Sequence, residues 1–132
     1  LYTLPPVNLG RGGGLHGKRQ GSALVHGDAS RRVRYELIEL DPLLDSANMG
    51  ADDWRVLARL VAAHYDDYDA FVIIHGTDTM AYSAAALSFM LDGLGKPVVL
   101  TGSQIPLSET RNDAITNLLG ALVVAGHFDI PE

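Results

Sequence analysis

The stretch FVIIHGTDTMAYSAAALSFM, residues 71–90, places a polar turn between a buried strand and an apolar helix. Its first four residues are branched or aromatic, which is typical of a strand that is covered on both faces of a parallel sheet. A nearly apolar helix is predicted from Met80 to Leu91. Between them lie Thr77, Asp78 and Thr79. A tight turn needs only Gly or Asn, so these polar groups require another explanation.

The same alternation of strand and helix continues on both sides of this stretch. VRYELIEL (33–40) and PVVL (97–100) have strand character, and helices are predicted from residue 51 and over residues 113–126. The order predicts an α/β fold: a parallel, doubly wound, flavodoxin-like sheet with flanking helices in three α/β/α layers. Three strands make a narrow sheet, so we expect a portion of a larger domain whose first strand and C-terminal part are missing.

The domain organisation is predicted to be simple. Residues 1–132 are interpreted as one partial α/β domain, with the strand and helix repeats over 33–132. The Gly-rich segment 10–32 has neither a helix period nor a strand period, which predicts a long flexible loop.

Composition excludes several classes of function. The formal charge of −6 disfavours a nucleic-acid partner. The absence of Cys removes disulfides, thiolate catalysis and Cys-based metal sites. No apolar run is long enough for a membrane helix. Gly12–Lys18 fits part of a phosphate-loop pattern, but Arg19 replaces the required Ser or Thr and the flanking strand and helix are missing. The five His residues lack the spacing of a metal site, and His75 is interpreted as a hydrogen-bonded structural residue.

Three small polar loops are predicted at one edge of the sheet: Asp45–Asn48, His75–Thr79 and Thr101–Gln104. Ligands of open parallel sheets bind beyond the carboxyl ends of the strands, so this edge is the predicted site. Gly76 lets the backbone turn tightly and approach a ligand, and the following hydroxyl and carboxylate lie near a helix N-terminus. The alternative is that Thr77 or Asp78 only caps that helix.

Four blocks in this order resemble the bacterial-type L-asparaginase family, and most closely its cytosolic type I branch. HGTDTM is similar to the family's second active-site motif, and DPLLDSANM to its substrate loop. KPVVLTGSQIPL and RNDAITNLLGAL are similar to the strand, loop and helix that follow. The resemblance covers about residues 33–132 and implies hydrolysis of L-asparagine to L-aspartate and ammonia through a Thr acyl-enzyme, without a metal or an organic cofactor.

The resemblance also implies roles for individual residues. Ser46 would bind the substrate α-carboxylate through its hydroxyl and nearby backbone N–H groups, and Asp78 would bind the α-ammonium. Thr77 would lie opposite the amide carbon, and Asp45 and Ala47 would shape the pocket. The predicted substrate-binding residues are Asp45, Ser46, Ala47, Gly76, Thr77 and Asp78, of which Thr77 and Asp78 are also predicted to be catalytic.

Two parts of the family's machinery do not occur in residues 1–132. The Thr-Gly-Gly-Thr turn with the main nucleophile is absent, and the family's Lys would fall past Glu132. Lys96 is predicted at the opposite edge of the sheet and cannot substitute. Because the nucleophile needs an activating partner, we expect residues 1–132 alone to be inactive. Ala47 and Asn48 also replace a more polar Ser-Asp pair of the family.

Two other functions are considered. The first is the related glutaminase-type subunit of glutamyl-tRNA(Gln) amidotransferase, which shares HGTDTM but fits GSQIPL and the negative charge less well. The second is a non-catalytic truncated relative that binds an amino acid weakly. For the asparaginase we expect a small-molecule substrate (L-asparagine, with L-glutamine as a further possibility), no membrane or nucleic-acid partner, a homodimer or homotetramer, and a cytoplasmic location.

Overall fold

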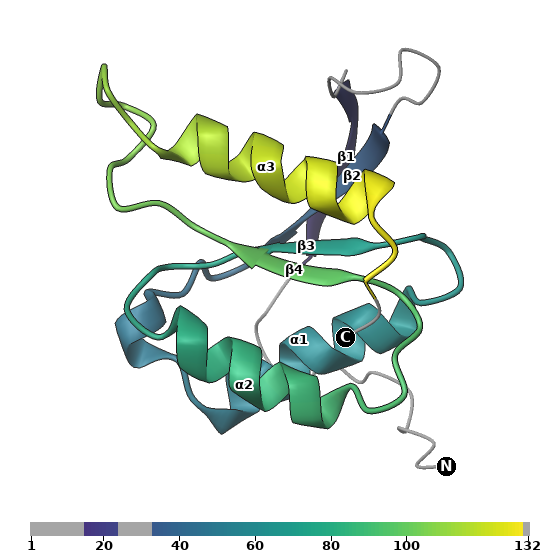
Figure 1. Cartoon of the computed structure of the whole chain (residues 1–132). Coiled ribbons are helices and arrows are strands. Elements are labelled where there is room, and N and C mark those ends of the chain that lie inside the picture. The colour runs from purple at the N-terminus through teal and green to yellow at the C-terminus, as the bar shows by residue number, and fades with distance from the viewer. Residues whose placement is uncertain (1–14, 24–32, 131–132) are drawn as a thin grey trace. The chain divides into compact units, whose positions relative to one another are not determined.

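A computed structural model describes residues 15–23 and 33–130 of the chain (Figure 1). The chain divides into two compact units, with the boundary between Leu44 and Asp45, and each unit is described by itself. The first contains strands β1 and β2. The second contains the turn η1, helices α1, α2 and α3, and strands β3 and β4.

The first unit is an antiparallel pair of strands. β1 (Leu15–Ala23) pairs with β2 (Val33–Leu40), with a register shift between His16 and Arg19. Two predictions are therefore wrong. Residues 15–23 form a strand rather than a loop, and β2 is antiparallel to β1 rather than part of the parallel sheet. The rest of the predicted loop, residues 10–14 and 24–32, lies outside the described residues.

The second unit has the predicted α/β architecture. It comprises η1 (Ser46–Asn48), α1 (Ala51–Ala63), β3 (Phe71–Ile74), α2 (Met80–Met90), β4 (Val98–Thr101) and α3 (Ala114–His127). β3 and β4 are parallel, paired from Phe71 with Val98 to Ile74 with Thr101. Figure 1 shows α3 against one face of this sheet and α1 and α2 on the other, so the predicted parallel sheet with flanking helices is confirmed.

α1 buries the apolar face that its sequence pattern predicts, whereas the nearly apolar α2 leaves Tyr82 and Phe89 exposed. Leu57, Ala58 and Val61 of α1 are buried, as is Leu87 of α2. At the start of α1 the Asp53 carboxylate accepts the Gly50 N–H at 2.8 Å, which pairs one of the free donors of the first turn. α1 and α2 also contact each other.

The carboxyl end of β3 differs from the sequence prediction. Phe71, Val72 and Ile73 are half-buried, but Ile74 is 63% exposed, although the whole run was predicted to be covered on both faces. In the described residues β3 pairs with β4 alone, so the other edge of β3 has no neighbouring strand. The apolar strand therefore ends at an open edge.

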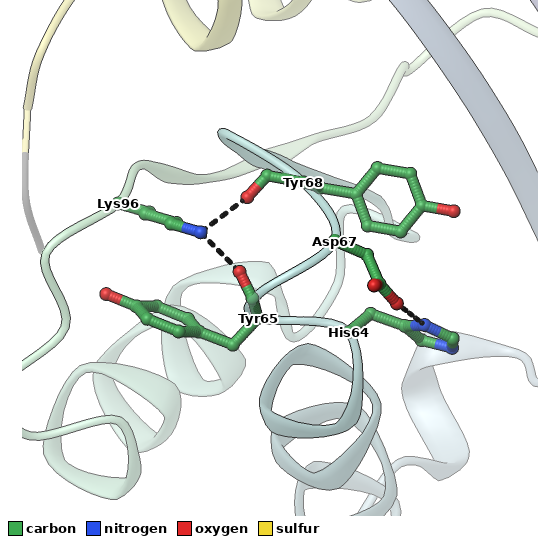
Figure 2. Close-up of polar contacts among 5 residues, drawn as sticks. All are labelled: His64, Tyr65, Asp67, Tyr68 and Lys96. Atoms are coloured by element: carbon green, nitrogen blue, oxygen red, sulfur yellow. Dashed lines mark hydrogen bonds and ion pairs between the residues drawn. The ribbon is translucent and has the colours of Figure 1, made fainter.

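Lys96 ties together the opposite, amino edge of the sheet (Figure 2). Its ammonium group donates to the backbone carbonyls of Tyr65 and Tyr68 and lies 4.4 Å from the centroid of the Tyr65 ring. The Gly95 N–H donates to the Tyr65 hydroxyl at 2.9 Å. This confirms that Lys96 is remote from the predicted site: it joins the turn after α1 to the approach to β4.

The contacts of Lys96 predict a measurable contribution to stability. Lys96→Met keeps most of the stem and removes the charged donor, so the free energy of unfolding is expected to fall by about 1.5–3 kcal/mol. The matched control is Arg55→Met, which removes an exposed ion pair with Asp52 and should cost less than about 1 kcal/mol. Urea unfolding of both variants measures the difference. Equal midpoints for the two variants would show that the Lys96 contacts contribute no more than an exposed ion pair.

Candidate functional site

Ser46 and Asp78 meet at the edge of the second unit where the parallel strands end. The side chain of Ser46 is buried, with 3% of the residue exposed, whereas Asp78 is exposed. The Ser46 hydroxyl donates to Asp78 Oδ2 at 3.4 Å. This distance is long for a bond from a hydroxyl to a carboxylate, so the contact is weak and both groups retain capacity for a ligand. Thr77, between Gly76 and Asp78, is half-buried.

Thr79 links the two turns through the backbone. Its hydroxyl donates to the Ser46 carbonyl at 2.7 Å, so the turn at 46–48 is fixed to the start of α2. Thr79, rather than Thr77 or Asp78, is also the N-cap residue of α2, and its side chain makes no capping hydrogen bond. The alternative explanation, that Thr77 or Asp78 caps the helix, is therefore wrong. Sequence reasoning assigned no role to Thr79, although it is part of the quoted motif.

Gly76 permits the close approach between the two turns. A Cβ atom at residue 76 would lie 2.6 Å from Ser46 Cβ and would also clash with Ser46 Oγ. Real Cβ contacts are essentially never shorter than 3.0 Å. The approach of the Gly76 backbone to a ligand stays a prediction, and the group that lies against Gly76 in the structure is the Ser46 side chain.

Asp45 and Ala47 flank Ser46 and are both exposed. The Asp45 carboxylate accepts the Ala47 N–H at 3.0 Å, and the Asn48 N–H donates to the Asp45 carbonyl at 2.9 Å. Two of the backbone donors near Ser46 are thus engaged within the turn itself. The role of Asp45 visible in the structure is to cap η1 and hold Ser46 in place.

The third predicted loop also reaches this edge. A Cβ atom at Gly102 would collide with the His75 carbonyl oxygen, so the loops after β3 and β4 are in contact. Asp113, at the start of α3, accepts the N–H groups of Gln104 and Ile105 at 3.0 and 2.9 Å. Asn117 donates to the Gly102 carbonyl at 2.9 Å. Sequence reasoning missed Asp113 and Asn117, although an Asp at a helix start is a recognisable signal.

The hydrogen bonds to Asp113 predict a pH dependence. The backbone N–H groups of Gln104 and then Ile105 hold the pKa of Asp113 below its ordinary value of 3.8. A lowered folded-state pKa means that this stabilisation is fully present above the unfolded-state pKa and is lost as the pH falls through the folded-state pKa. The difference in unfolding free energy between the wild type and Asp113→Asn should therefore shrink below pH 3.8. A difference that stays constant through acid titration would contradict this account.

An apolar cavity of about 440 Å³ lies beside Ser46 and Asp78, which we call the polar pair. Its walls are the ends of β3 and β4, with Gly76 and Gly102, and apolar side chains of α3 that include Ile115, Leu118 and Leu119. Ser46, Thr77 and Asp78 do not line it. The polar pair and the cavity thus share the Gly76 turn but are separate features of this edge.

The residues that the structure describes hold no cluster of three His, Cys, Asp or Glu side chains arranged for a metal ion. Their helices include none with the length and apolar character needed to cross a membrane.

The fold and the polar pair define a class: α/β proteins with a small polar site beyond the carboxyl ends of parallel strands. The family model for the N-terminal part of asparaginases matches residues 15–132. The chain therefore belongs to the asparaginase family.

Individual relatives agree with this assignment. The chain is 59% identical over 98 residues to L-asparaginase 1 of Escherichia coli K12, which covers 74% of this chain and 29% of that protein. It is 50% identical over 111 residues to the 60 kDa lysophospholipase of Homo sapiens, covering 83% of this chain and 19% of that protein. The crystal structure of L-asparaginase I from Vibrio cholerae superposes with a TM-score of 0.68 at 60% identity, covering 70% of this chain and 28% of that one. The chain thus spans less than a third of the length of each of these relatives.

Proposed function

We propose that the protein containing this chain is an L-asparaginase, which hydrolyses the side-chain amide of L-asparagine to L-aspartate and ammonia. Residues 45–132 would supply the groups that hold the amino-acid end of the substrate. The observation that carries the proposal is the Ser46 hydroxyl 3.4 Å from Asp78 Oδ2. Membership of the asparaginase family supports it.

The chemistry of the pair suits an α-amino acid. The Asp78 carboxylate would bind the α-ammonium group in a charge-assisted hydrogen bond. The Ser46 hydroxyl can rotate and donate to the α-carboxylate instead of to Asp78. Together the two side chains match both charges of one zwitterion, so a dicarboxylate without an amino group should bind poorly.

Thr77 would lie next to the bound side-chain amide and help to position the reacting carbonyl or a water molecule. The acyl-enzyme would form on a Thr of the family's first motif, which residues 1–132 do not contain. Asp78 would orient the substrate by its ammonium group. Binding by residues 1–132 and turnover by the enzyme that contains them are accordingly separate tests.

Calorimetry on residues 1–132 tests the binding part of the proposal. We expect L-aspartate to bind and succinate, which lacks the ammonium group, to bind much more weakly. Asp78→Asn should reduce the affinity for L-aspartate by about 10–100-fold, the effect of losing a hydrogen bond between charged groups. Asp92→Asn is the matched control because Asp92 is exposed in the turn after α2 and loses the same charge. Equal affinities for the two variants would refute the assignment of Asp78.

Ammonia release from L-asparagine by the gene product that contains this chain tests the reaction. We propose L-asparagine as substrate, with L-glutamine as a possible second one. Turnover that required a charged tRNA would indicate the amidotransferase subunit instead, and fatty-acid release from a lysophospholipid would indicate a lipase activity. Binding of L-aspartate with no hydrolysis of L-asparagine by that gene product would leave only the non-catalytic alternative.

The proposal includes the setting of the enzyme. The formal charge of −6 supports a small-molecule substrate without a nucleic-acid partner. We propose a homodimer or homotetramer in the cytoplasm, and the absence of Cys fits a reducing compartment.

A further inference from the structure

A chain of three hydrogen bonds, buried at its centre, leads from α1 to the turn that carries Thr77 and Asp78. The Trp54 indole N–H donates to Ser83 Oγ at 2.8 Å, and Ser83 Oγ lies 2.8 Å from His75 Nε2. His75 Nδ1 lies 2.6 Å from the Gly76 carbonyl oxygen. Ser83 is 0% exposed and His75 6% exposed, so water does not compete for these groups. The prediction that His75 is a hydrogen-bonded structural residue is confirmed, but its partner lies inside the candidate site.

The two ends of the chain determine the direction of two hydrogen bonds, and a neutral imidazole would determine the third. An indole N–H can only donate and a carbonyl oxygen can only accept. His75 Nδ1 must therefore carry a proton, which it donates to Gly76. Ser83 accepts from Trp54, and with the single ring proton on Nδ1 its own proton is donated to Nε2. All four groups are satisfied in this arrangement.

We propose that Trp54, Ser83 and His75 form a positioning chain that fixes the Gly76–Thr77 peptide plane and, with it, the placement of Thr77 and Asp78. The consequence for ligand binding rests on the proposed function. The consequence for the order of the turn does not depend on it.

The turn has few other restraints. In the described part of the chain, the N–H groups of Gly76, Thr77 and Asp78 donate no backbone hydrogen bond. The His75 N–H, by contrast, donates to the Thr101 carbonyl at 2.8 Å and is fixed by the sheet. The imidazole thus extends the restraint beyond the end of β3, because its Nδ1–H holds the Gly76 carbonyl, two residues after Ile74.

The geometry of the Gly76–Thr77 peptide determines where the Thr77 N–H points. In a trans peptide the C=O and N–H bonds point in opposite directions. With the Gly76 carbonyl turned to the buried His75 ring, the Thr77 N–H must point away from that ring. The positioning chain therefore orients both a backbone donor and the side chains that follow it.

Ser83 connects the positioning chain to α2. It lies one turn after Thr79 in α2, and its N–H donates to the Thr79 carbonyl at 3.0 Å. Thr79 in turn donates to the Ser46 carbonyl. Both turns of the candidate site are thus hydrogen-bonded to the start of α2. The turn at 46–48 is held through Thr79, and the turn at 76–78 through Ser83 and His75.

The test is nitrogen-15 NMR on residues 1–132 with four variants. His75→Asn places an amide donor where Nδ1 was, and His75→Gln places its amide near the former Nε2 and loses the contact with Gly76. Ser83→Ala removes the middle of the chain. Ser88→Ala is the matched control, because Ser88 is an exposed serine of the same helix that donates to its own backbone at Ala85.

In the wild type we expect the tautomer with the proton on Nδ1 and a Thr77 amide order parameter of about 0.85, the value of rigid backbone. His75→Asn and Ser88→Ala should keep that value, whereas His75→Gln and Ser83→Ala should lower it toward about 0.6. The order parameters of α1 and α3 should not change, which separates positioning of the turn from general loss of structure.

The affinity for L-aspartate is the second readout. Ser83→Ala and His75→Gln should weaken binding by about tenfold, as expected for one lost hydrogen bond, and His75→Asn should restore most of it. A wild type that does not bind L-aspartate would count against the proposed function, while the order parameters would still decide on the positioning chain. The positioning chain would be overturned by a His75 proton on Nε2 alone, or by a Thr77 amide that is equally rigid in the wild type and all four variants. If His75→Gln does not fold, the wild-type tautomer and the Thr77 order parameter of Ser83→Ala still test the positioning chain.

Discussion

Gly76→Ala is expected to abolish L-aspartate binding and to lower the free energy of unfolding by about 2–3 kcal/mol, the upper range for an overpacked site. The added methyl group would lie 2.6 Å from Ser46 Cβ, so rotation of the Ser46 hydroxyl alone cannot relieve the clash. Ser46 is buried and its carbonyl is held by Thr79. One turn must therefore move, which separates Ser46 from Asp78.

Gly120→Ala is the matched control for this experiment. Gly120 lies in α3, where an added Cβ meets no atom within 4 Å. Alanine is favoured over glycine in a helix by about 1 kcal/mol, so this variant should be more stable than the wild type and should bind L-aspartate normally. Urea unfolding and calorimetry measure both effects. If Gly76→Ala binds as Gly120→Ala does, the close approach of the two turns is unimportant.

Gly102→Ala is expected to be at least as damaging to stability, with a loss of about 3 kcal/mol or more. A Cβ at this position would collide with the carbonyl oxygen of His75 and would lie 2.7 Å from Met80 Cε. The His75 backbone cannot yield easily, because its N–H donates to the Thr101 carbonyl at 2.8 Å within the same parallel pair. Relief of the clash would separate the ends of β3 and β4.

A double substitution identifies which neighbour of Gly102 causes the damage. Met80→Ala removes the methionine methyl but leaves the His75 carbonyl in place. We expect no recovery of stability when it is added to Gly102→Ala, and urea unfolding of the single and double variants gives the coupling between the two sites. Full recovery would mean that the flexible Met80 side chain, rather than the strand backbone, limits this position.

The second unit could be predicted from local sequence patterns. The apolar stripe of α1 and the branched run of β3 specify their elements within a few residues, because each buries a face of its own sequence. β1 could not be predicted in this way. LHGKRQGSA has no apolar period, and it is a strand because its backbone pairs with β2. The antiparallel direction of that pairing is a non-local property, which the order of elements did not reveal.

The site shows the same division between local and non-local information. The adjacency of Ser46 and Asp78, expected from convergent loops, is confirmed, although β2 does not enter the parallel sheet as that argument assumed. Their role in binding stays a prediction. The contacts of Thr79, His75 and Asp113 could not be read from sequence, because each depends on a partner brought near by the fold.

Titration of the nitrogen-15-labelled chain with L-aspartate tests the central claim most directly. The account predicts that the amide signals of Ser46, Thr77 and Asp78 shift together, saturate with one dissociation constant, and do not respond to succinate at the same concentration. If L-aspartate leaves these three signals unchanged while the chain is folded, or shifts signals at the Lys96 edge instead, then Ser46 and Asp78 do not hold an amino acid between them.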